Sequence, residues 1–468
     1  MTQTSPQPNT PQPNHVNTNR KPRIVIVGAG FVGLYAAKAL RKADAEVVLI
    51  DQNNYHTFQP LIYQVATAEL EPGEVAHTVR MIFQRQKNFT FRQATVTGVD
   101  WDAKTLELIG GDTLPFDYLI VGAGAVYNDF GIPGVKEHAF YVKSLTEAVN
   151  IRSHILRQFE RVSADPSLID QGALNFVIVG GGPTGVETSG ALSELFERVL
   201  PQDYPDVDVS RAKIILVEML DYLMAPYGDK SRQYTADVLR GRGVDLRLGE
   251  ALSEVRENEV ELKSGEVIPT ETLIWAAGVR GHPLVDVLDA PLEKGYRIKV
   301  NPDLSFSGRP YAFAAGDISG AKDKDGKMYP QVAQVAIQGG RFAAKTIMNE
   351  LKGNRDRGRF SYFDKGNMAI IGRNAGVAEL GKVFLGIKLR GFLGWLSWLF
   401  IHLVYLPGYR NRLGALTDWA YNYLTFDRRA RLITDMTPSP AEVADRADRK
   451  VSGVQTAKRG REAQFAAK

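Results

Sequence analysis

The stretch that most constrains the fold runs over residues 23–51 and reads RIVIVGAGFVGLYAAKALRKADAEVVLID. An apolar run meets a glycine motif made of Gly28, Gly30 and Gly33. An Ala- and Leu-rich segment then leads to a second apolar run that ends in Asp51. This order predicts a strand, a tight turn, a helix and a second strand, with free N–H groups at the helix N-terminus. Because Gly30 lets a pyrophosphate approach the backbone and Asp51 can accept hydrogen bonds from a ribose, the stretch predicts a dinucleotide site.

A second copy of the pattern begins at Asn175 with NFVIVGGGPTGVETSGAL. Its glycines are Gly180, Gly182 and Gly185, and its second apolar run (213–217) ends in Glu218. Repetition of the unit after roughly 150 residues indicates an internal duplication, and two units predict two dinucleotides. A carboxylate such as Glu218 suits two ribose hydroxyls and repels a 2′-phosphate, and no arginine follows it before Arg232. The second unit therefore favours NADH over NADPH.

Each copy leads to a third buried strand that ends in a turn of small residues. The first reads PFDYLIVGAGA over Pro115–Ala125, and the second reads TLIWAAGVR over Thr272–Arg280. A further turn, AAGD, ends in Asp317, and a helix rich in small residues is expected to open near Ala333. Strands that alternate with helices at glycine turns indicate an α/β fold with two Rossmann-like dinucleotide-binding domains.

Composition narrows the classes of function. At 468 residues the chain has room for two or three domains, and a net charge of +4 gives no reason to expect a nucleic-acid partner. The chain has no cysteine, which excludes dithiol redox chemistry, cysteine-ligated iron–sulfur clusters and disulfides. The seven histidines lack metal-ligand spacing, so no metal site is predicted. Residues 1–20 have no signal-peptide core and are expected to be a disordered tail on a protein that is not exported.

Residues 382–431 differ from the rest because they hold three of the five tryptophans among many aromatic and basic residues. The 19 residues 391–409 carry no formal charge, which reaches transmembrane length, but cationic residues flank both ends. The next segment is amphipathic, with Leu413, Leu416, Ala420, Tyr423 and Leu424 on one face and Asn411, Asp418, Asn422 and Thr425 on another. We interpret the region as an interfacial anchor lying in the membrane plane. A single span and a dimer interface are the alternatives.

Taken together, these motifs resemble the two-dinucleotide flavoprotein reductases. More narrowly, FQPLIYQVATA, WAAGV, AQVAIQGG and the aromatic, basic C-terminus are similar to type II NADH dehydrogenases, the single-subunit NADH:quinone oxidoreductases. The resemblance covers residues 21–433. It implies that FAD occupies the first unit and NADH the second, and that a hydride passes from NADH to FAD before a membrane quinone takes two electrons.

The expected cellular location follows from the supply of NADH and from the absence of an export signal. Because NADH is supplied in the cytoplasm and the chain has no export signal, we expect a peripheral enzyme on the cytoplasmic face of the cell membrane. At most one segment could span the bilayer and no buried proton-relay helices are expected, so we predict that the enzyme does not pump protons.

The resemblance also assigns residues to the two cofactors. The positions that match the FAD site are Gly28, Ala29, Gly30, Phe31, Val32, Gly33, Asp51, Val96, Ala123, Gly316, Asp317 and Gln334. Those that match the NADH site are Gly180, Gly182, Pro183, Thr184, Gly185, Glu187, Glu218, Ala277 and Gly278. The helix near Ala333 would point its N-terminus at the flavin pyrimidine edge, where a helix dipole contributes roughly 0.3–1 kcal/mol toward the anionic reduced state. For Asp317, an ordinary turn or N-cap aspartate is the alternative.

Four residues are expected to take part in the chemistry: Glu187, Gln334, Gln338 and Lys365. By resemblance, Glu187 lies between nicotinamide and flavin and supports hydride or proton transfer, although a glutamate early in a helix also compensates the dipole. Gln334 and Gln338 are four apart on one helix face and would line the quinone site, or else pack as hydrogen-bonded buried amides. Lys365 would lie near the quinone entrance and stabilise charge on the quinone oxygen, or else be a solvated lysine at a strand start.

The predicted order is a disordered tail (1–20), an FAD-binding domain (21–140 and 300–381), an NADH-binding domain (141–299), membrane-anchoring helices (382–436) and a second disordered tail (437–468). The expected partners are a membrane quinone and the membrane surface, through residues 385–431. A homodimer and the identity of the quinone stay open. The alternatives are a soluble NADH:ferredoxin or rubredoxin reductase, which needs no aromatic anchor, and a flavin redox sensor without significant turnover. Disulfide- and sulfide-oxidising relatives are excluded by the missing cysteines.

Overall fold

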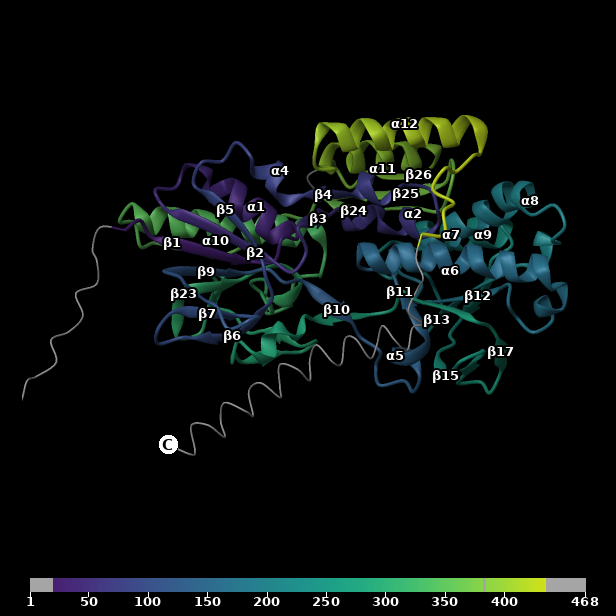
Figure 1. Cartoon of the computed structure of the whole chain (residues 1–468), viewed down its shortest axis with the longest axis horizontal. Helices are drawn as coiled ribbons and strands as arrows, with labels where there is room; N and C mark the ends of the chain where they lie inside the picture. The colour runs from purple at the N-terminus through teal and green to yellow at the C-terminus, as the bar shows by residue number, and fades with distance from the viewer. Residues whose placement is uncertain (1–19, 382–383, 435–468) are drawn as a thin grey trace, which may run out of the picture.

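The computed structural model describes residues 20–381 and 384–434, so the two predicted tails lie outside the described residues, apart from Arg20. Two α/β units lie side by side along the long axis of the molecule (Figure 1). The C-terminal helices α11 (Phe392–Tyr405) and α12 (Tyr409–Thr425) run along one edge, close to the junction of the units (Figure 1).

The first unit is built on a six-stranded sheet with a parallel centre. Its strand order is β22 (Ser305–Phe306), β23 (Arg309–Ala314), β9 (Tyr118–Val121), β1 (Arg23–Val27), β2 (Glu46–Asp51) and β5 (Phe89–Gln93). One face is covered by α1 (Phe31–Ala39) and α10 (Ala333–Leu351), and the other by β6 (Val96–Asp100), β7 (Thr105–Leu108) and β8 (Thr113–Pro115). Alternate residues of β1 serve the two faces, because Ile24 packs with the helices and Val25 with the smaller sheet.

The second unit repeats this plan. Its all-parallel sheet has the order β11 (Ala139–Tyr141), β18 (Thr272–Trp275), β12 (Asn175–Val179), β13 (Lys213–Glu218) and β14 (Asp245–Leu248). Helices α6 (Leu145–Ala164), α7 (Pro183–Glu194) and α9 (Asp229–Gly241) lie on one side, and β15 (Leu252–Arg256), β16 (Glu259–Leu262) and β17 (Val267–Pro269) on the other. Ile178 and Val177 alternate between the two clusters as Ile24 and Val25 do in the first unit. The duplication expected from the glycine motifs is thus visible in the layers.

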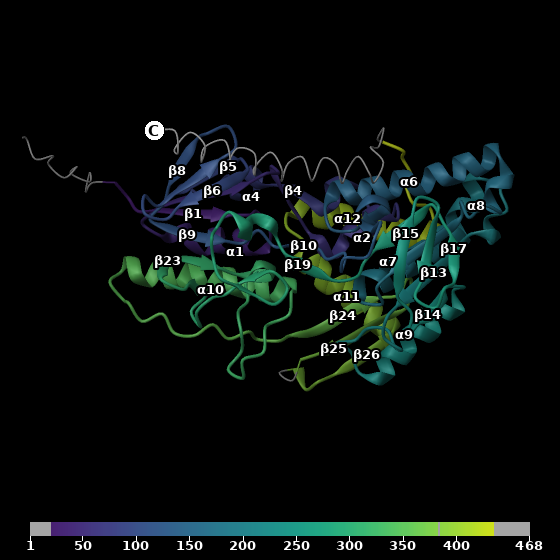
Figure 2. The same ribbon diagram turned by 90° about the horizontal axis from the view of Figure 1, so that it is seen from below.

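Short elements join the two units. The antiparallel pair β10 (Ala125–Tyr127) and β19 (Val279–Gly281) lies between them (Figure 2). Helix α2 (Ile62–Ala66) belongs to the first unit in sequence but packs against α6 and α7 of the second. The other short elements are β3 (Tyr55–Thr57), α3 (Pro72–Val75), β4 (Ala76–Thr78), α4 (Val79–Phe83), α5 (Val135–His138), α8 (Leu200–Asp203), β20 (Leu292–Glu293) and β21 (Arg297–Ile298).

The C-terminal region is built into the core of the molecule. An antiparallel sheet of β24 (Gly366–Ile370), β25 (Gly376–Leu380) and β26 (Lys388–Gly391) leads directly into α11. On α11, Trp398 is completely buried. On α12, the Asn411 amide donates to the backbone carbonyls at Gly73, Glu74 and Ala76. Residues 382–436, expected from sequence to be anchoring helices alone, therefore also contribute a strand and core side chains.

Helix α12 presents its apolar face outward. Its buried residues are Asn411, Ala415, Trp419 and Asn422. Its exposed apolar residues are Leu413, Leu416, Tyr423 and Leu424, and α11 adds Phe392, Leu393, Leu396, Phe400 and Val404. We call this set the exposed apolar face. Two residues of the polar face predicted from sequence, Asn411 and Asn422, are turned inward, where their side-chain amides donate to backbone carbonyls.

The uncharged stretch 391–409 is interrupted rather than continuous. Helix α11 ends at Tyr405, and α12 begins at Tyr409 after Pro407 and Gly408, whose φ of 85° favours glycine. Among the helices of the described residues, none combines the length and the apolar character that crossing a bilayer requires.

Candidate active site

The first glycine turn leaves open space at the N-terminus of α1. Gly28 has a φ of 100°, and a side chain there would lie 2.5 Å from the Gly122 carbonyl oxygen, so glycine is required. At Gly30, by contrast, a side chain would meet only that oxygen, at 4.0 Å. The Asp51 carboxylate accepts a hydrogen bond from the Ala29 N–H at 2.6 Å. An open backbone, a helix N-terminus and a carboxylate at the strand end fit the pyrophosphate and ribose of FAD.

The second glycine turn repeats this geometry. Gly180 has a φ of 111° and lies against Ala276, where a side chain would be 2.9 Å from the backbone. A side chain at Gly182, the N-cap of α7, would meet nothing within 4 Å. Glu218 accepts a hydrogen bond from the Gly181 N–H at 2.5 Å. The second turn therefore offers the same kind of cradle, with a carboxylate placed beside it as Asp51 is in the first.

The remaining matched residues fall into two groups. Most frame the turns: Ala29, Phe31, Val32, Gly33 and Ala123 in the first unit, and Pro183, Thr184, Gly185, Ala277 and Gly278 in the second. Gly278 has a φ of 61° and lies directly under the Phe130 ring, so a larger residue would collide there. Val96 differs, because its side chain packs in the core on the far side of the first sheet. Only its backbone could approach a cofactor.

The N-terminus of α10 lies beside the first glycine turn. A side chain at Gly340 would lie 2.5 Å from the Val32 carbonyl oxygen, so Gly340 lets α10 pack directly on α1. Asp317 follows Gly316 in a short turn that packs against α10. The Asp317 carboxylate is 3.8 Å from the Lys143 Nζ. The structure thus brings the AAGD turn, the α10 N-terminus and the glycine turn together.

Both glutamines of α10 bind the segment that leads into β24. Gln334 donates to the Gly366 carbonyl at 2.9 Å and accepts from the Lys365 N–H at 3.2 Å. Gln338 exchanges two hydrogen bonds of 2.9 Å with the backbone of Phe363. The two amides therefore hold this segment in place through their own hydrogen bonds.

Lys365 connects that segment to the C-terminal helices. Its Nζ donates to the Tyr405 hydroxyl at 2.7 Å, at the end of α11. The lysine is therefore directed toward the C-terminal helices rather than free in solvent at the start of a strand.

Glu187 is the buried carboxyl at the junction of the units. It lies in the second turn of α7 and is 8% exposed. It accepts hydrogen bonds from the Ile370 N–H at 3.4 Å and from the Trp398 indole N–H at 3.2 Å. Burial raises the pKa of Glu187 to about 8, although both hydrogen bonds act in the opposite direction. Burial therefore favours the protonated form of this carboxyl.

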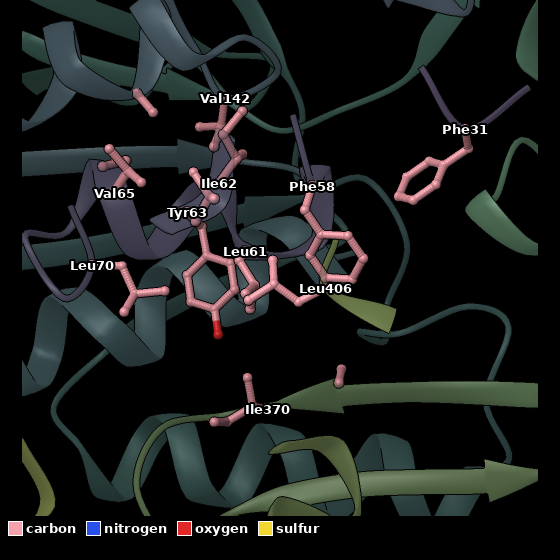
Figure 3. Close-up of a cluster of buried hydrophobic side chains, with 14 of the residues drawn as sticks. Phe31, Phe58, Leu61, Ile62, Tyr63, Val65, Leu70, Val142, Ile370 and Leu406 are labelled. Carbon is pink, nitrogen blue, oxygen red and sulfur yellow. The ribbon is translucent and has the colours of Figure 1, made fainter. Parts of the chain in front are cut away.

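A cavity of about 50 Å³ adjoins Glu187. Its polar lining comes from Tyr63, Gln64, Glu69, Glu194, Arg373, Asn422 and Arg428, and its apolar lining from Ile370, Trp395, Leu399 and Trp419, among others. Figure 3 shows the Tyr63 ring amid the apolar cluster around α2, with its hydroxyl directed toward the strand of Ile370. The Trp419 indole donates to Gln64 at 3.0 Å, so α12 closes one side of the cavity.

Comparison with known proteins identifies the family. Residues 22–340 match the family described as pyridine nucleotide-disulphide oxidoreductase. The chain is 37% identical over 431 residues to the type II NADH:quinone oxidoreductase Ndh of Mycobacterium tuberculosis, covering 89% of this chain and 91% of that protein. The chain belongs to the type II NADH:quinone oxidoreductase family. The family resemblance seen in the sequence motifs is confirmed.

Two further relatives extend the comparison. The type II NADH:quinone oxidoreductase of Staphylococcus aureus is 30% identical over 376 residues, covering 78% of this chain and 92% of that protein. The structure of NDH2 from Plasmodium falciparum in complex with NADH matches with a TM-score of 0.79 at 20% identity, covering 89% of this chain and all of that chain. The fold is therefore the pyridine nucleotide-disulphide oxidoreductase fold, and the expected cofactors, FAD and NADH, are confirmed. Unlike the disulphide chemistry in the family description, this type II NADH:quinone oxidoreductase has no cysteine.

Several residues around Glu187 were not assigned a role from sequence. Trp398 and Trp419 were expected in a membrane anchor, yet both indoles donate hydrogen bonds inside the protein. Tyr63 lies in FQPLIYQVATA, which served only as a motif of the family resemblance, and Glu69 directly follows that motif. Polar residues in a short, buried helix were the available signal, because buried polar groups need partners.

Proposed function

We propose that this protein transfers two electrons from NADH to a membrane quinone at the cytoplasmic face of the cell membrane, with FAD held in the first unit. The observation that carries the proposal is a buried carboxyl, Glu187, in the helix that begins at the second of two open glycine-turn cradles. When bound, FAD supplies the two-electron relay between NADH and the quinone. The side chains and backbone of the protein bind and orient FAD, NADH and the quinone, and Glu187 supplies a proton.

The two cradles position the reactants. The N-terminus of α1 would hold the FAD pyrophosphate while Asp51 receives the adenosine ribose. The N-terminus of α7 and Glu218 would do the same for NADH, and the negative charge of Glu218 would repel a 2′-phosphate. Asp317 and the N-terminus of α10 would face the rest of the FAD molecule.

Glu187 is suited to hold the proton that quinone reduction requires. NADH carries two electrons and one proton as hydride, whereas a quinol contains two protons, so one proton must come from the medium in each turnover. A buried carboxyl with a pKa of about 8 holds such a proton at neutral pH and can donate it to a quinone oxygen.

The quinone would meet the segment between α10 and β24. Gln334 and Gln338 fix the backbone of this segment, and Lys365 extends from it toward the C-terminal helices. A lysine ammonium there would stabilise negative charge on a quinone oxygen as reduction proceeds. In this proposal the glutamines act by positioning Lys365.

The exposed apolar face would be buried in the bilayer surface. Leu424 is 79% exposed and Phe400 is 64% exposed. The basic residues Arg410 and Arg412 of α12 are exposed, as is Arg390 of β26, just before α11. Apolar side chains bordered by cations suit an anionic membrane surface, where each cation contributes about 1 kcal/mol. Binding in this way would bring the quinone to Lys365 directly from the membrane.

The proposal is tested with FAD-loaded enzyme and vesicles that contain a quinone. Oxidation of NADH by vesicle-bound enzyme, with formation of one quinol per NADH, is the expected result. Equal rates with bound and unbound enzyme would contradict the membrane part of the proposal.

A further inference from the structure

The cavity beside Glu187 contains a second carboxyl that the proposed reaction leaves without a role. Glu69 follows α2 and lines the cavity together with Glu187, Tyr63 and Gln64. Among the described residues, none donates a hydrogen bond to its carboxylate. A volume of about 50 Å³ with several polar groups can hold water, since one water needs about 10–15 Å³ measured in this way.

Charges from three other segments face Glu69. Arg428, which follows α12, and Arg373, in the turn between β24 and β25, are positive, and Glu194 at the end of α7 is negative. Glu194 is itself held by Arg242 at 2.7 Å and by Arg428 at 3.3 Å. Burial raises the pKa of Glu69 to about 7, because the two arginines only partly offset burial and the charge of Glu194.

Tyr63 lines the same cavity as the two carboxyls. Burial raises the pKa of its hydroxyl, and the charges of Glu187 and Glu69 add to that rise. The hydroxyl stands 3.2 Å from the Gln64 amide. The amide donates that hydrogen bond, so the hydroxyl hydrogen of Tyr63 stays free to be donated into the cavity. A hydroxyl that accepts on one side and donates on the other can pass a proton.

The outer end of the cavity reaches the surface at aromatic and basic side chains. Tyr423 and Phe426 line it and are exposed, and the Arg373 guanidinium lies 3.6 Å from the centroid of the Phe426 ring. Glu69 therefore lines one cavity with Glu187 and with side chains that reach the surface. The glycines of the two nucleotide turns do not line this cavity.

We propose that Glu69 relays the proton of the medium, through cavity water and the Tyr63 hydroxyl, to Glu187 after Glu187 has given its own proton to the quinone. This inference rests on the proposed role of Glu187. In each turnover one proton enters at Glu69, one moves from Glu69 to Glu187, and one leaves Glu187 on the quinol. No electron moves along this route, so charge and mass balance with the one proton that the overall reaction consumes.

The test is the substitution Glu69→Gln in full-length, FAD-loaded enzyme. Reduction by NADH is followed first without oxygen by flavin absorbance. Quinone-dependent reoxidation is then measured over many turnovers with excess NADH and a water-soluble quinone, because a single reoxidation uses the proton that Glu187 already holds. The reduction by NADH should be unchanged, and the reoxidation rate over many turnovers should slow by at least about tenfold. The part of the wild-type pH dependence that lies near pH 7 should disappear in the variant, which leaves the fall near pH 8 that belongs to Glu187.

Two further variants and a rescue separate a relay from a structural role. Glu69→Asp keeps a titratable group and should retain most of the rate together with the pH dependence. Glu197→Gln removes an exposed carboxylate near the cavity that does not line it, and should behave as wild type. Added formate or azide, small weak acids that can enter the cavity, should restore part of the reoxidation rate of Glu69→Gln.

Two results would overturn the relay. One is an unchanged reoxidation rate and pH profile in Glu69→Gln. The other is a slow variant that formate and azide do not rescue and that has also lost FAD. Glu187→Gln is measured in parallel, because wild-type reoxidation in that variant would reject the proposed role of Glu187 whatever Glu69→Gln shows.

Discussion

Trp398 donates its indole N–H to the buried carboxyl of Glu187 at 3.2 Å, and this bond joins helix α11 to the helix that follows the second glycine turn. The same indole stacks on His402 with ring centroids 3.9 Å apart. The C-terminal region is therefore a wall of the candidate active site as well as the carrier of the exposed apolar face. Removing residues 385–468 would open the site, so membrane binding has to be tested with surface substitutions.

We predict that Trp398→Phe moves the alkaline limb of quinone reduction to higher pH. Glu187 has to be protonated to donate, so the rate falls as pH rises through its pKa of about 8. The indole hydrogen bond stabilises the ionised carboxyl, and its loss raises the pKa of Glu187 further. The measurement is the pH profile of quinone-dependent reoxidation. Trp101→Phe, which removes a similar indole bond to the Leu288 carbonyl far from Glu187, should leave the profile unmoved.

Coenzyme choice should depend on Glu218. Its carboxylate accepts from the N–H groups of Gly181 and Leu220, and in the proposed NADH site its charge would face a ribose 2′-substituent. We expect Glu218→Gln to narrow the preference for NADH over NADPH by about tenfold, equivalent to about 1.4 kcal/mol. The ratio of kcat/KM for the two coenzymes measures this. The matched variant Asp51→Asn in the first unit should lower FAD retention and leave the ratio of kcat/KM for NADH and NADPH unchanged. An unchanged ratio in Glu218→Gln would show that Glu218 does not select the coenzyme.

Lys365 and Tyr405 allow a paired test, because either Lys365→Met or Tyr405→Phe breaks the same 2.7 Å contact. If the cation stabilises the quinone oxygen, Lys365→Met slows quinone-dependent reoxidation by about tenfold or more, whereas Tyr405→Phe keeps the cation and most of the rate. Stopped-flow reoxidation at several quinone concentrations distinguishes the two variants. An equal loss of reoxidation rate in both variants would mean that the rate depends on the contact between Lys365 and Tyr405 and not on the charge of the lysine.

Binding to anionic vesicles should depend on the exposed apolar face. The combined variant Leu413→Gln, Leu416→Gln and Leu424→Gln changes only exposed side chains, so it should fold, and it should bind vesicles at least about tenfold more weakly. Ile109→Gln and Met219→Gln alter exposed apolar residues elsewhere and serve as controls. Co-sedimentation with vesicles gives the affinities.

Light scattering on the same variants distinguishes the occupant of that face. The wild type could be a dimer and the triple variant a monomer, while both bind vesicles equally well. In that case the exposed apolar face is an interface between two copies of the chain. That outcome would contradict the membrane proposal.

Local patterns were enough to predict the two nucleotide units. Both glycine turns and their terminal acids, Asp51 and Glu218, depend on short-range rules of backbone conformation and helix N-termini, which a sequence states directly. The opening of α10 at Ala333 was predicted for the same reason. The duplication was predicted from the repeated glycine motif, and the α/β fold from strands that alternate with helices.

Contacts between residues that are distant in the sequence could not be predicted from it. The bond between Trp398 and Glu187 joins residues 211 positions apart, and the bond between Trp419 and Gln64 spans 355. The composition of residues 382–431 favoured a membrane anchor. A tryptophan in an apolar run has the same sequence pattern whether its side chain contacts lipid or the protein core. The orientation of α12 was also ambiguous, because Asn411 and Asn422 are buried beside Ala415 and Trp419 and donate to backbone carbonyls that are distant in the sequence.

The central claim is tested most directly by steady-state oxidation of NADH with a short-chain quinone, using purified, FAD-loaded enzyme in closed vesicles that contain a pH indicator. We predict one quinol formed for each NADH oxidised, with no acidification of the vesicle interior. Tight FAD binding without turnover would contradict it in favour of a redox sensor. Turnover with ferredoxin or rubredoxin and none with quinone would contradict it in favour of a soluble reductase.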